Sequence, residues 1–253
     1  MDGPGRVYLI GAGPGDPELM TLKAVRRLRE ADVVLHDRLV GEGVLAFARP
    51  DAERVFVGKR RAHHHMRQVE IHELMVRRAL RGQTVARLKG GDPMIFGRGG
   101  EEVEALIEAG VPFEVVPGVT AAAGCAAEYA LPLTHRDHAQ SLTLVTGHAK
   151  DGEPHLDWPS LCRPGQTLAF YMGHTALERL CARLVTHGLR PDLPATLIEN
   201  GTLPQSRRHA GTLTTLPRLV AGLTFDGPAL LLVGEVAGLA CVRQAAVAAA
   251  AAG

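Results

Sequence analysis

A glycine-rich run follows the first apolar segment of the chain, with a spacing close to that of dinucleotide-binding turns. It reads G-A-G-P-G-D-P, residues 11–17. A dinucleotide site needs glycine in the third position of G-x-G-x-x-G. Asp16 stands there instead, and a carboxylate at a helix N-terminus repels a pyrophosphate. Pro14 and Pro17 also remove two backbone donors. The run predicts close backbone approach to a ligand other than NAD, although Asp37 lies about where a ribose-binding acid would.

A second glycine-rich segment, L-K-G-G-D-P-M-I-F-G-R-G-G-E-E, spans residues 88–102 and follows a strand pattern. Loops beyond the carboxyl ends of parallel strands are where α/β proteins bind ligands, and glycine lets the backbone approach them. Asp92, Arg98 and Glu101 add charged groups. No G-K-S or G-K-T follows, so the segment is not a P-loop. We interpret it as a ligand-binding loop rather than a tight connection alone.

Three consecutive histidines, residues 63–65, invite a metal interpretation. Neighbouring side chains on an extended chain point to opposite faces, so the three cannot converge on one ion. We expect a solvated or substrate-facing loop and no metal. The cysteines are scattered without a C-x-x-C pair, and we expect free thiols in a reducing cytoplasm; they are Cys125, Cys162, Cys181 and Cys241.

Short apolar strands alternate with helical patterns in the first half of the chain. Strands are predicted at 7–10, 32–37, 55–57, 85–88 and 113–116. Either Asp16 or Thr21 is the candidate N-cap of the helix that follows the first strand, and Pro17 suits a first helical position. This alternation predicts an α/β fold with a mainly parallel sheet covered on both faces.

The pattern breaks near residues 134–140 and restarts with further strands, predicted at 141–145, 167–171, 195–198, 208–213 and 229–233. We therefore expect two α/β domains, residues 1–136 and 137–243, followed by a low-complexity alanine-rich tail at 244–253.

Composition excludes several classes of protein. The 253 residues carry a net charge of +1, which argues against bulk binding to nucleic acid or an anionic membrane. No apolar run approaches the length of a membrane span, and no signal pattern stands at the N-terminus. We expect a cytoplasmic protein that can bind charged ligands only through a local cluster of cations.

An ordered series of motifs resembles the tetrapyrrole methylases over residues 7–236, and within them the uroporphyrinogen-III C-methyltransferases. Beyond the two glycine-rich segments, the series comprises D-R-L-V, V-G-K-R, V-P-G-V-T-A-A, L-P-L-T-H-R, V-T-G-H, Y-M-G, E-N-G-T and V-G-E-V. The runs D-R-L-V, F-G-R-G-G-E-E and T-H-R are the ones that point to this narrower group.

The resemblance implies two α/β domains with S-adenosylmethionine in the cleft between them, S-adenosylhomocysteine as product, and a homodimer. A sulfonium ligand needs no phosphate nest, which suits a turn containing Asp16. The implied cofactor contacts are Pro14, Gly90, Gly91, Asp92, Ile95, Thr120, Ala121, Met172 and Gly201.

The resemblance also implies a substrate, a cyclic tetrapyrrole with eight carboxylates, methylated at ring carbons 2 and 7 to give precorrin-2. Substrate contacts would fall on Arg60, Arg136 and Met172, and arginine suits carboxylates. Each methylation releases a proton, so a base helps. Asp37 is the implied proton acceptor and Lys59 the donor. Arg98 is a rival base despite its high pKa, and Glu101 would either polarise it or cap the next helix.

Three alternatives stay open at this point. Another superfamily methyltransferase, such as a later precorrin methylase or a diphthamide or ribosomal RNA enzyme, would share the fold and cofactor. An NAD-dependent oxidoreductase is opposed by Asp16, and the siroheme synthases that resemble the chain carry an additional dehydrogenase region, so we expect no NAD-linked activity. A non-catalytic tetrapyrrole-binding protein is opposed by the presence of Asp37, Lys59 and Met172.

Overall fold

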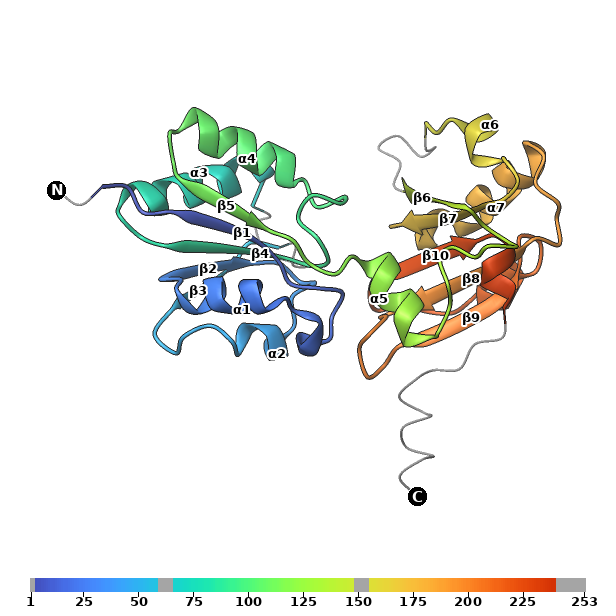
Figure 1. Cartoon of the computed structure of the whole chain (residues 1–253), viewed down its shortest axis with the longest axis horizontal. Coiled ribbons are helices and arrows are strands. Elements are labelled where there is room, and N and C mark those ends of the chain that lie inside the picture. Colours follow the sequence, from blue (N-terminus) through green and yellow to red (C-terminus); the bar gives the residue numbers. More distant parts are fainter. Residues whose placement is uncertain (1–2, 59–65, 148–154, 240–253) are drawn as a thin grey trace, which may run out of the picture. The chain divides into compact units, whose positions relative to one another are not determined.

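The computed structural model describes residues 3–58, 66–147 and 155–239. The chain divides into two compact units, Met1–Thr120 and Ala121–Gly253, and each contains one five-stranded sheet (Figure 1). The two-domain α/β architecture predicted from the alternating pattern is therefore confirmed. None of the helices in the described ranges has the length and apolar character needed to cross a bilayer.

The sheet of the N-terminal unit is entirely parallel. Its order is β3-β2-β4-β1-β5, with β1 (Val7–Gly11), β2 (Val33–His36), β3 (Glu53–Phe56), β4 (Val85–Lys89) and β5 (Phe113–Val116). The longer helices are α1 (Leu22–Arg29), α3 (Gln68–Leu80) and α4 (Gly99–Glu108), with the short α2 (Glu42–Leu45). All carboxyl ends of these strands consequently meet at one edge of the sheet.

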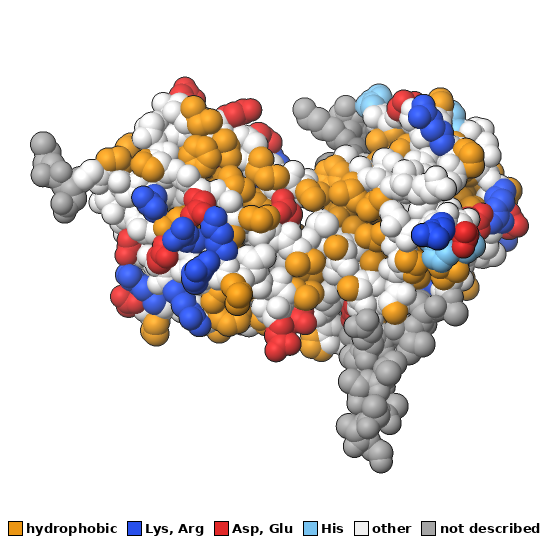
Figure 2. Space-filling view, in the orientation of Figure 1, with side chains coloured by type: hydrophobic (Ala, Val, Ile, Leu, Met, Phe, Trp, Pro, Cys, Tyr) orange, Lys and Arg blue, Asp and Glu red, His pale blue; other side chains and the backbone are white. Residues whose placement is uncertain are grey.

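Alternate residues of each strand feed two separate cores, as side chains on opposite faces of a sheet must. On β1, Tyr8 and Ile10 pack with residues of α1 and α2, whereas Val7 and Leu9 pack with residues of α3 and α4. Figure 1 shows these helix pairs on opposite faces of the sheet. The face seen in Figure 2 shows Lys and Arg side chains of this unit interspersed with Asp and Glu.

Of the two alternative N-caps for the helix after the first glycine run, Thr21 is the one observed, and Asp16 caps a separate 3-10 helix. Asp16 Oδ1 accepts a hydrogen bond of 2.9 Å from the Glu18 amide and caps the 3-10 helix η1 (Pro17–Leu19). Thr21 Oγ1 accepts one of 3.1 Å from the Ala24 amide and caps α1. The carboxylate that excludes a pyrophosphate is therefore used to begin a helix.

The C-terminal unit has a mixed sheet in the order β6-β7-β10-β8-β9. Only the β6–β7 pair is parallel, and the other three pairs are antiparallel. Its strands are β6 (Ser141–Thr146), β7 (Gln166–Tyr171), β8 (Pro194–Glu199), β9 (Arg207–Thr212) and β10 (Ala229–Val233); its helices are α5 (Ala121–Glu128), α6 (Trp158–Leu161), α7 (Leu177–Thr186) and α8 (Leu216–Val220), with the 3-10 helices η2 (His174–Ala176) and η3 (Glu235–Gly238).

The compact units divide before α5, whereas the sequence pattern placed the boundary after residue 136. The reason is that α5 contributes its buried side chains to the C-terminal core, where Cys125 packs with Ile198 and Leu230. Glu128 at the end of α5 also accepts hydrogen bonds from the Thr202 amide at 2.7 Å and the Ser206 hydroxyl at 2.8 Å. The alanine-rich tail lies outside the described residues.

Candidate active site

Three glycines bring the backbones of β1, β4 and β5 into direct contact at the carboxyl edge of the parallel sheet. A Cβ on Gly11 would lie 2.5 Å from the Gly118 nitrogen, and one on Gly118 would overlap the Gly91 carbonyl. The Gly91 amide donates to the Gly13 carbonyl at 2.6 Å, and the Gly13 amide donates back at 3.2 Å. The two glycine-rich segments of the sequence thus form one junction.

Asp92 ties this junction together through its carboxylate. Its Oδ2 accepts a hydrogen bond of 3.0 Å from the Gly118 amide, and its Oδ1 accepts one of 2.8 Å from the Met94 amide. The side chain therefore holds the loop after β4 against the loop after β5. Its predicted contact with the cofactor stays a prediction.

Two residues of the predicted site, Arg98 and Met172, and three neighbours of predicted residues lie in left-handed backbone, which is costly without glycine and concentrates at ligand sites. In the N-terminal unit these are Phe96 and Arg98, with φ of 51° and 57°. In the C-terminal unit Met172 follows β7 with φ of 57°, and Asn200 and Thr202 flank Gly201 with φ of 51° and 69°.

The two turns of the C-terminal unit lie at the same edge of its sheet. Both β7 and β8 run antiparallel to β10, which stands between them, so their carboxyl ends point the same way. Met172 and Gly201 therefore share that edge, as their common assignment to the cofactor requires. A Cβ on Gly201 would overlap Cys125 Sγ, so this backbone lies directly on α5.

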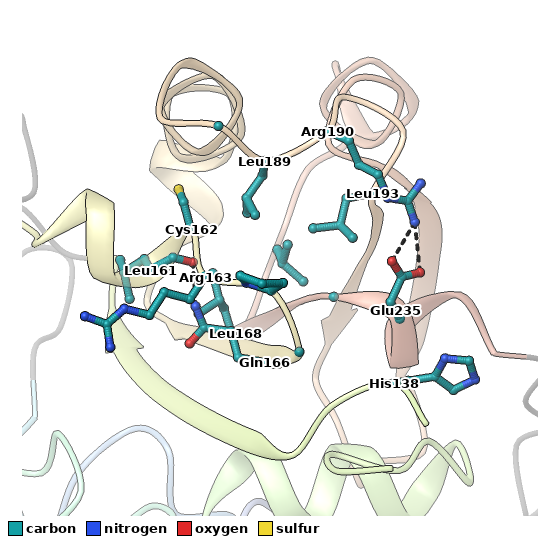
Figure 3. Close-up of a pocket in the computed structure, with 15 residues that line it drawn as sticks. His138, Leu161, Cys162, Arg163, Gln166, Leu168, Leu189, Arg190, Leu193 and Glu235 are labelled. Atoms are coloured by element: carbon teal, nitrogen blue, oxygen red, sulfur yellow. Dashed lines mark hydrogen bonds and ion pairs between the residues drawn. The ribbon is translucent and has the colours of Figure 1, made fainter. Parts of the chain in front are cut away.

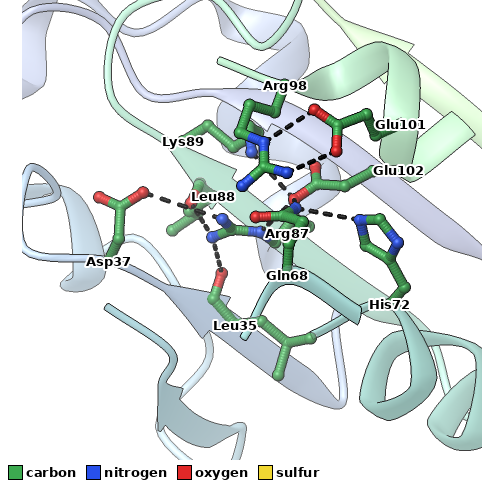
Figure 4. Close-up of polar contacts among 10 residues, drawn as sticks. All are labelled: Leu35, Asp37, Gln68, His72, Arg87, Leu88, Lys89, Arg98, Glu101 and Glu102. Atoms are coloured by element: carbon green, nitrogen blue, oxygen red, sulfur yellow. Dashed lines mark hydrogen bonds and ion pairs between the residues drawn. The ribbon is translucent and has the colours of Figure 1, made fainter. Parts of the chain in front are cut away.

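A buried ion network lies beneath the carboxyl edge of the parallel sheet (Figure 4). Glu102 on α4 has no exposed surface, and its Oε1 accepts from Arg87 Nε at 3.1 Å, Lys89 Nζ at 2.9 Å and Gln68 Nε2 at 3.2 Å. Arg87 and Lys89 on β4 are only 4% and 5% exposed. Burial, and then the charge of Arg87, lowers the pKa of Lys89.

Our sequence interpretation missed this network. Its signal is the pair of cations two residues apart in V-A-R-L-K, an otherwise apolar strand. Residues at that spacing share one face of a strand, and a buried charge requires a partner. The partner, Glu102, was not recognised because acidic residues are common in the first turn of a helix, where Glu101 also stands.

Asp37, the predicted proton acceptor, follows β2 beside this network. Its Oδ1 accepts a hydrogen bond of 2.9 Å from the Leu39 amide. Its Oδ2 lies 3.9 Å from Arg87 Nη2, an ion pair longer than a hydrogen bond. One carboxylate oxygen is therefore hydrogen-bonded, and the other faces the Arg87 guanidinium.

Arg98 and Glu101 form a bidentate pair at the start of α4, with Nε to Oε1 at 2.7 Å and Nη2 to Oε2 at 2.5 Å. This hydrogen bonding raises the pKa of Arg98 and lowers that of Glu101. A guanidinium whose pKa is raised further makes a poor base, so the geometry favours a charge-bearing role for Arg98. Of the two roles open for Glu101, fixing Arg98 is the one its contacts support.

The remaining predicted residues are dispersed. Thr120 and Ala121 stand at the start of α5, where the Ala122 amide donates to Tyr171 Oη at 3.1 Å. Arg136 is exposed on the loop before β6. Lys59, Arg60 and the histidines at 63–65 lie outside the described residues. In the described part of the chain, no group of three or more His, Cys, Asp or Glu residues could hold a metal ion.

A separate cavity of about 310 Å³ lies within the C-terminal unit (Figure 3). It is lined by residues before and at the start of β7 and at the end of β10, among them Gln166 and Val233. Met172 lies beyond the other end of β7, so the cavity is at the opposite edge from the predicted cofactor turns. Its Arg190 is already paired with Glu235 at 2.8 Å and Asp192 at 2.9 Å.

Residues 6–217 match the family model described as Tetrapyrrole (Corrin/Porphyrin) Methylases. The chain belongs to the tetrapyrrole methylase family. It is 46% identical to the uroporphyrin-III C-methyl transferase of Thermus thermophilus in complex with S-adenyl homocysteine, with a TM-score of 0.78 over 92% of this chain and 98% of that one. A cobalt precorrin-4 methyltransferase matches at 29% identity with a TM-score of 0.82, over 92% of this chain and 96% of that one.

Curated relatives of this tetrapyrrole methylase include the siroheme synthases of Pseudomonas paraeruginosa and Gluconacetobacter diazotrophicus, at 56% and 57% identity. Each alignment covers 92% of this chain but 50% of the relative. The chain thus spans about half the length of the curated relatives that it matches. The family predicted from the motif series is confirmed.

Proposed function

We propose that this tetrapyrrole methylase transfers methyl groups from S-adenosylmethionine to ring carbons 2 and 7 of uroporphyrinogen III, giving precorrin-2 by way of precorrin-1. The observation that carries this proposal is the 46% identity to the Thermus uroporphyrin-III C-methyl transferase along nearly its whole length. The cobalt precorrin-4 enzyme has a similar fold but only 29% identity, which disfavours a later precorrin as substrate.

The described residues fit an S-adenosylmethionine ligand. The first glycine run uses Asp16 as a helix cap, and a carboxylate at that helix start suits a sulfonium ligand better than a phosphate. Gly201 lies so close to Cys125 that any side chain there would displace one of them. The groups proposed to hold the cofactor are Pro14, Gly90, Gly91, Asp92, Ile95, Thr120, Ala121, Met172 and Gly201. When bound, the cofactor supplies a methyl group already activated on sulfonium.

The acidic substrate requires local cations because the whole chain carries a net charge of only +1. Arg98 is suited to this role, since its side chain is 55% exposed and Glu101 fixes its direction. Arg136 is a second exposed cation. Together with Arg60 and Met172 we assign them to substrate binding.

Asp37 is proposed to take the proton that the macrocycle must lose after each methylation, since the methylated ring carbon itself carries none. Its side chain is 27% exposed, so it can meet solvent and substrate, and the Leu39 amide and Arg87 lie beside its two oxygens. General bases of this kind contribute about 100-fold to 10,000-fold in rate. Lys59 is proposed as the donor that returns a proton.

Anaerobic incubation with isotopically labelled S-adenosylmethionine and enzymatically prepared uroporphyrinogen III tests the proposal. Mass spectrometry should detect a product carrying two labelled methyl groups. An absence of methylated product, with transfer to a later precorrin instead, would reassign the substrate. Calorimetric titration should detect binding of S-adenosylhomocysteine, and binding of NAD alone would refute methyl transfer.

We also propose that the enzyme works as a homodimer, as its family resemblance implies. Light scattering on the eluting peak of a sizing column should give twice the chain mass of 27.0 kDa. A mass equal to one chain at working concentration would refute this assignment.

A further inference from the structure

The buried part of the network in Figure 4, formed by Arg87, Lys89 and Glu102, contains one more positive charge than negative. Arg87 and Lys89 both bond to Glu102, and all three are at least nine-tenths buried. A buried charge without a partner is strongly unfavourable. The described acid that faces the surplus cation is Asp37, whose Oδ2 lies 3.9 Å from Arg87 Nη2.

The guanidinium of Arg87 is fixed on every other side. Its Nε donates to Glu102, and its Nη1 donates to the backbone carbonyls of Leu88 at 2.9 Å and Leu35 at 3.5 Å. Arg87 is the register partner of Leu35 on β2, and Asp37 follows Leu35 by two residues. The strand pairing thus leaves Nη2 directed at Asp37.

We propose that Arg87, anchored by Glu102, is a positioning residue that holds the carboxylate of Asp37 in the orientation needed to accept the substrate proton. The inference deepens the proposed methyl transfer and rests on it. The Leu39 amide holds Oδ1 and Arg87 attracts Oδ2, so the plane of the carboxylate is set from both sides. The network is electrically balanced when Asp37 is ionised, which is the form that accepts a proton.

Arg87→Lys tests the inference, because lysine keeps the buried positive charge for Glu102 but lacks the planar fork that reaches Asp37. We expect kcat to fall about 10-fold or more, because misplacing a reacting group by about 1 Å can cost 100-fold. KM for uroporphyrinogen III and the affinity for S-adenosylhomocysteine should change less than about threefold. Arg49→Lys is the matched control. Arg49 pairs with Asp32, which precedes the first residue of β2 and so lies at the end of the strand away from Asp37.

The decisive readout is a double-mutant cycle with Asp37→Asn. If Arg87 acts through Asp37, Arg87→Lys should scarcely alter the residual rate of the Asp37→Asn enzyme. An equal loss in both backgrounds, or an unchanged kcat in the wild-type background, would overturn the inference. Glu102→Asp, which shortens the anchor but keeps its charge, provides the same comparison if Arg87→Lys does not fold.

This result is separable from the test of the proposed function. A wild-type enzyme that forms the doubly methylated product while the cycle shows no coupling would refute only the role of Arg87. A wild-type enzyme that forms no product would refute the methyl transfer, and the positioning role with it.

Discussion

Among the described residues, each unit of the molecule contains one fully buried glutamate, and the surroundings of the two differ. Glu102 in the N-terminal unit meets two buried cations. Glu199 in the C-terminal unit pairs with Arg207 at 2.7 Å, but the Arg207 side chain is 53% exposed, and Glu199 also accepts from the Asp226 amide. The N-terminal unit therefore keeps charge inside, beneath the predicted proton acceptor, whereas the C-terminal unit directs its charge to solvent.

The sheets explain this difference. In a parallel sheet every strand ends at one edge, so the loops after β1, β2, β4 and β5 converge and can carry several charged groups. In the mixed sheet only β6, β7 and β8 have their carboxyl ends at the same edge. The loops after β7 and β8 contain left-handed backbone at Met172 and on both sides of Gly201. We therefore assign proton chemistry to the N-terminal unit, and to the C-terminal unit mainly the shape of the cofactor site.

The largest difference in the free energy of unfolding is expected between the Glu102→Gln and Glu199→Gln variants. Removing one member of a buried charge pair costs about 3–5 kcal/mol, which applies to Glu102. Loss of Glu199 should cost about 1 kcal/mol, because water can solvate the half-exposed Arg207. Urea denaturation followed by circular dichroism measures both, and equal losses would remove the contrast between the units.

Two glycine substitutions should differ in whether they can be rescued. Gly118→Ala places a methyl group against the backbones of Gly91 and Gly11, which cannot give way, and should cost about 1–3 kcal/mol. Gly201→Ala meets the Cys125 side chain, so adding Cys125→Ala should restore most of the lost stability. Gly100→Ala, with open space around it, is the control. Failure of the Cys125 rescue would contradict the described contact.

Alkaline pH should lower the stability of the C-terminal unit, by less than the buried-charge and glycine substitutions do. Burial raises the pKa of Cys125 and of Cys181 to about 12 from an ordinary value of 9.0. Their contribution to stability is intact below pH 9 and is lost as the pH rises above it, at about 1 kcal/mol per thiol near pH 9.5. In the N-terminal unit burial lowers the pKa of Lys89. The free-energy cost of keeping its charge buried therefore decreases as the pH rises, which is the opposite dependence.

Trp158 is the single tryptophan of the chain and is buried in the C-terminal core, so its fluorescence reports on that unit. The thermal unfolding midpoint measured by this fluorescence should fall by a few degrees between pH 7.5 and pH 9.5. The Cys125→Ala/Cys181→Ala variant should lose most of this dependence. An unchanged dependence in that variant would assign the effect to other groups.

The sequence predicted the features that follow from local rules. The cap at Thr21 and the parallel first sheet both depend on neighbouring residues or on the local alternation of strands and helices. It did not predict the boundary before α5, because the contacts of Cys125 with β8 and β10 span long separations. Nor did it reveal Glu102, since only the tertiary structure shows which of several helix-start acids is buried.

The division of roles between the units is tested most directly by measuring turnover and S-adenosylhomocysteine affinity in Asp37→Asn and Gly201→Ala side by side. Asp37→Asn should lose about 100-fold or more in kcat and keep its affinity within about twofold. Gly201→Ala should lose about 10-fold in affinity and keep most of its kcat at saturating methyl donor, as expected for loss of uniform binding. If Asp37→Asn turned over at the wild-type rate, or if both variants lost affinity alike, the assignment of proton chemistry to the N-terminal unit would be wrong.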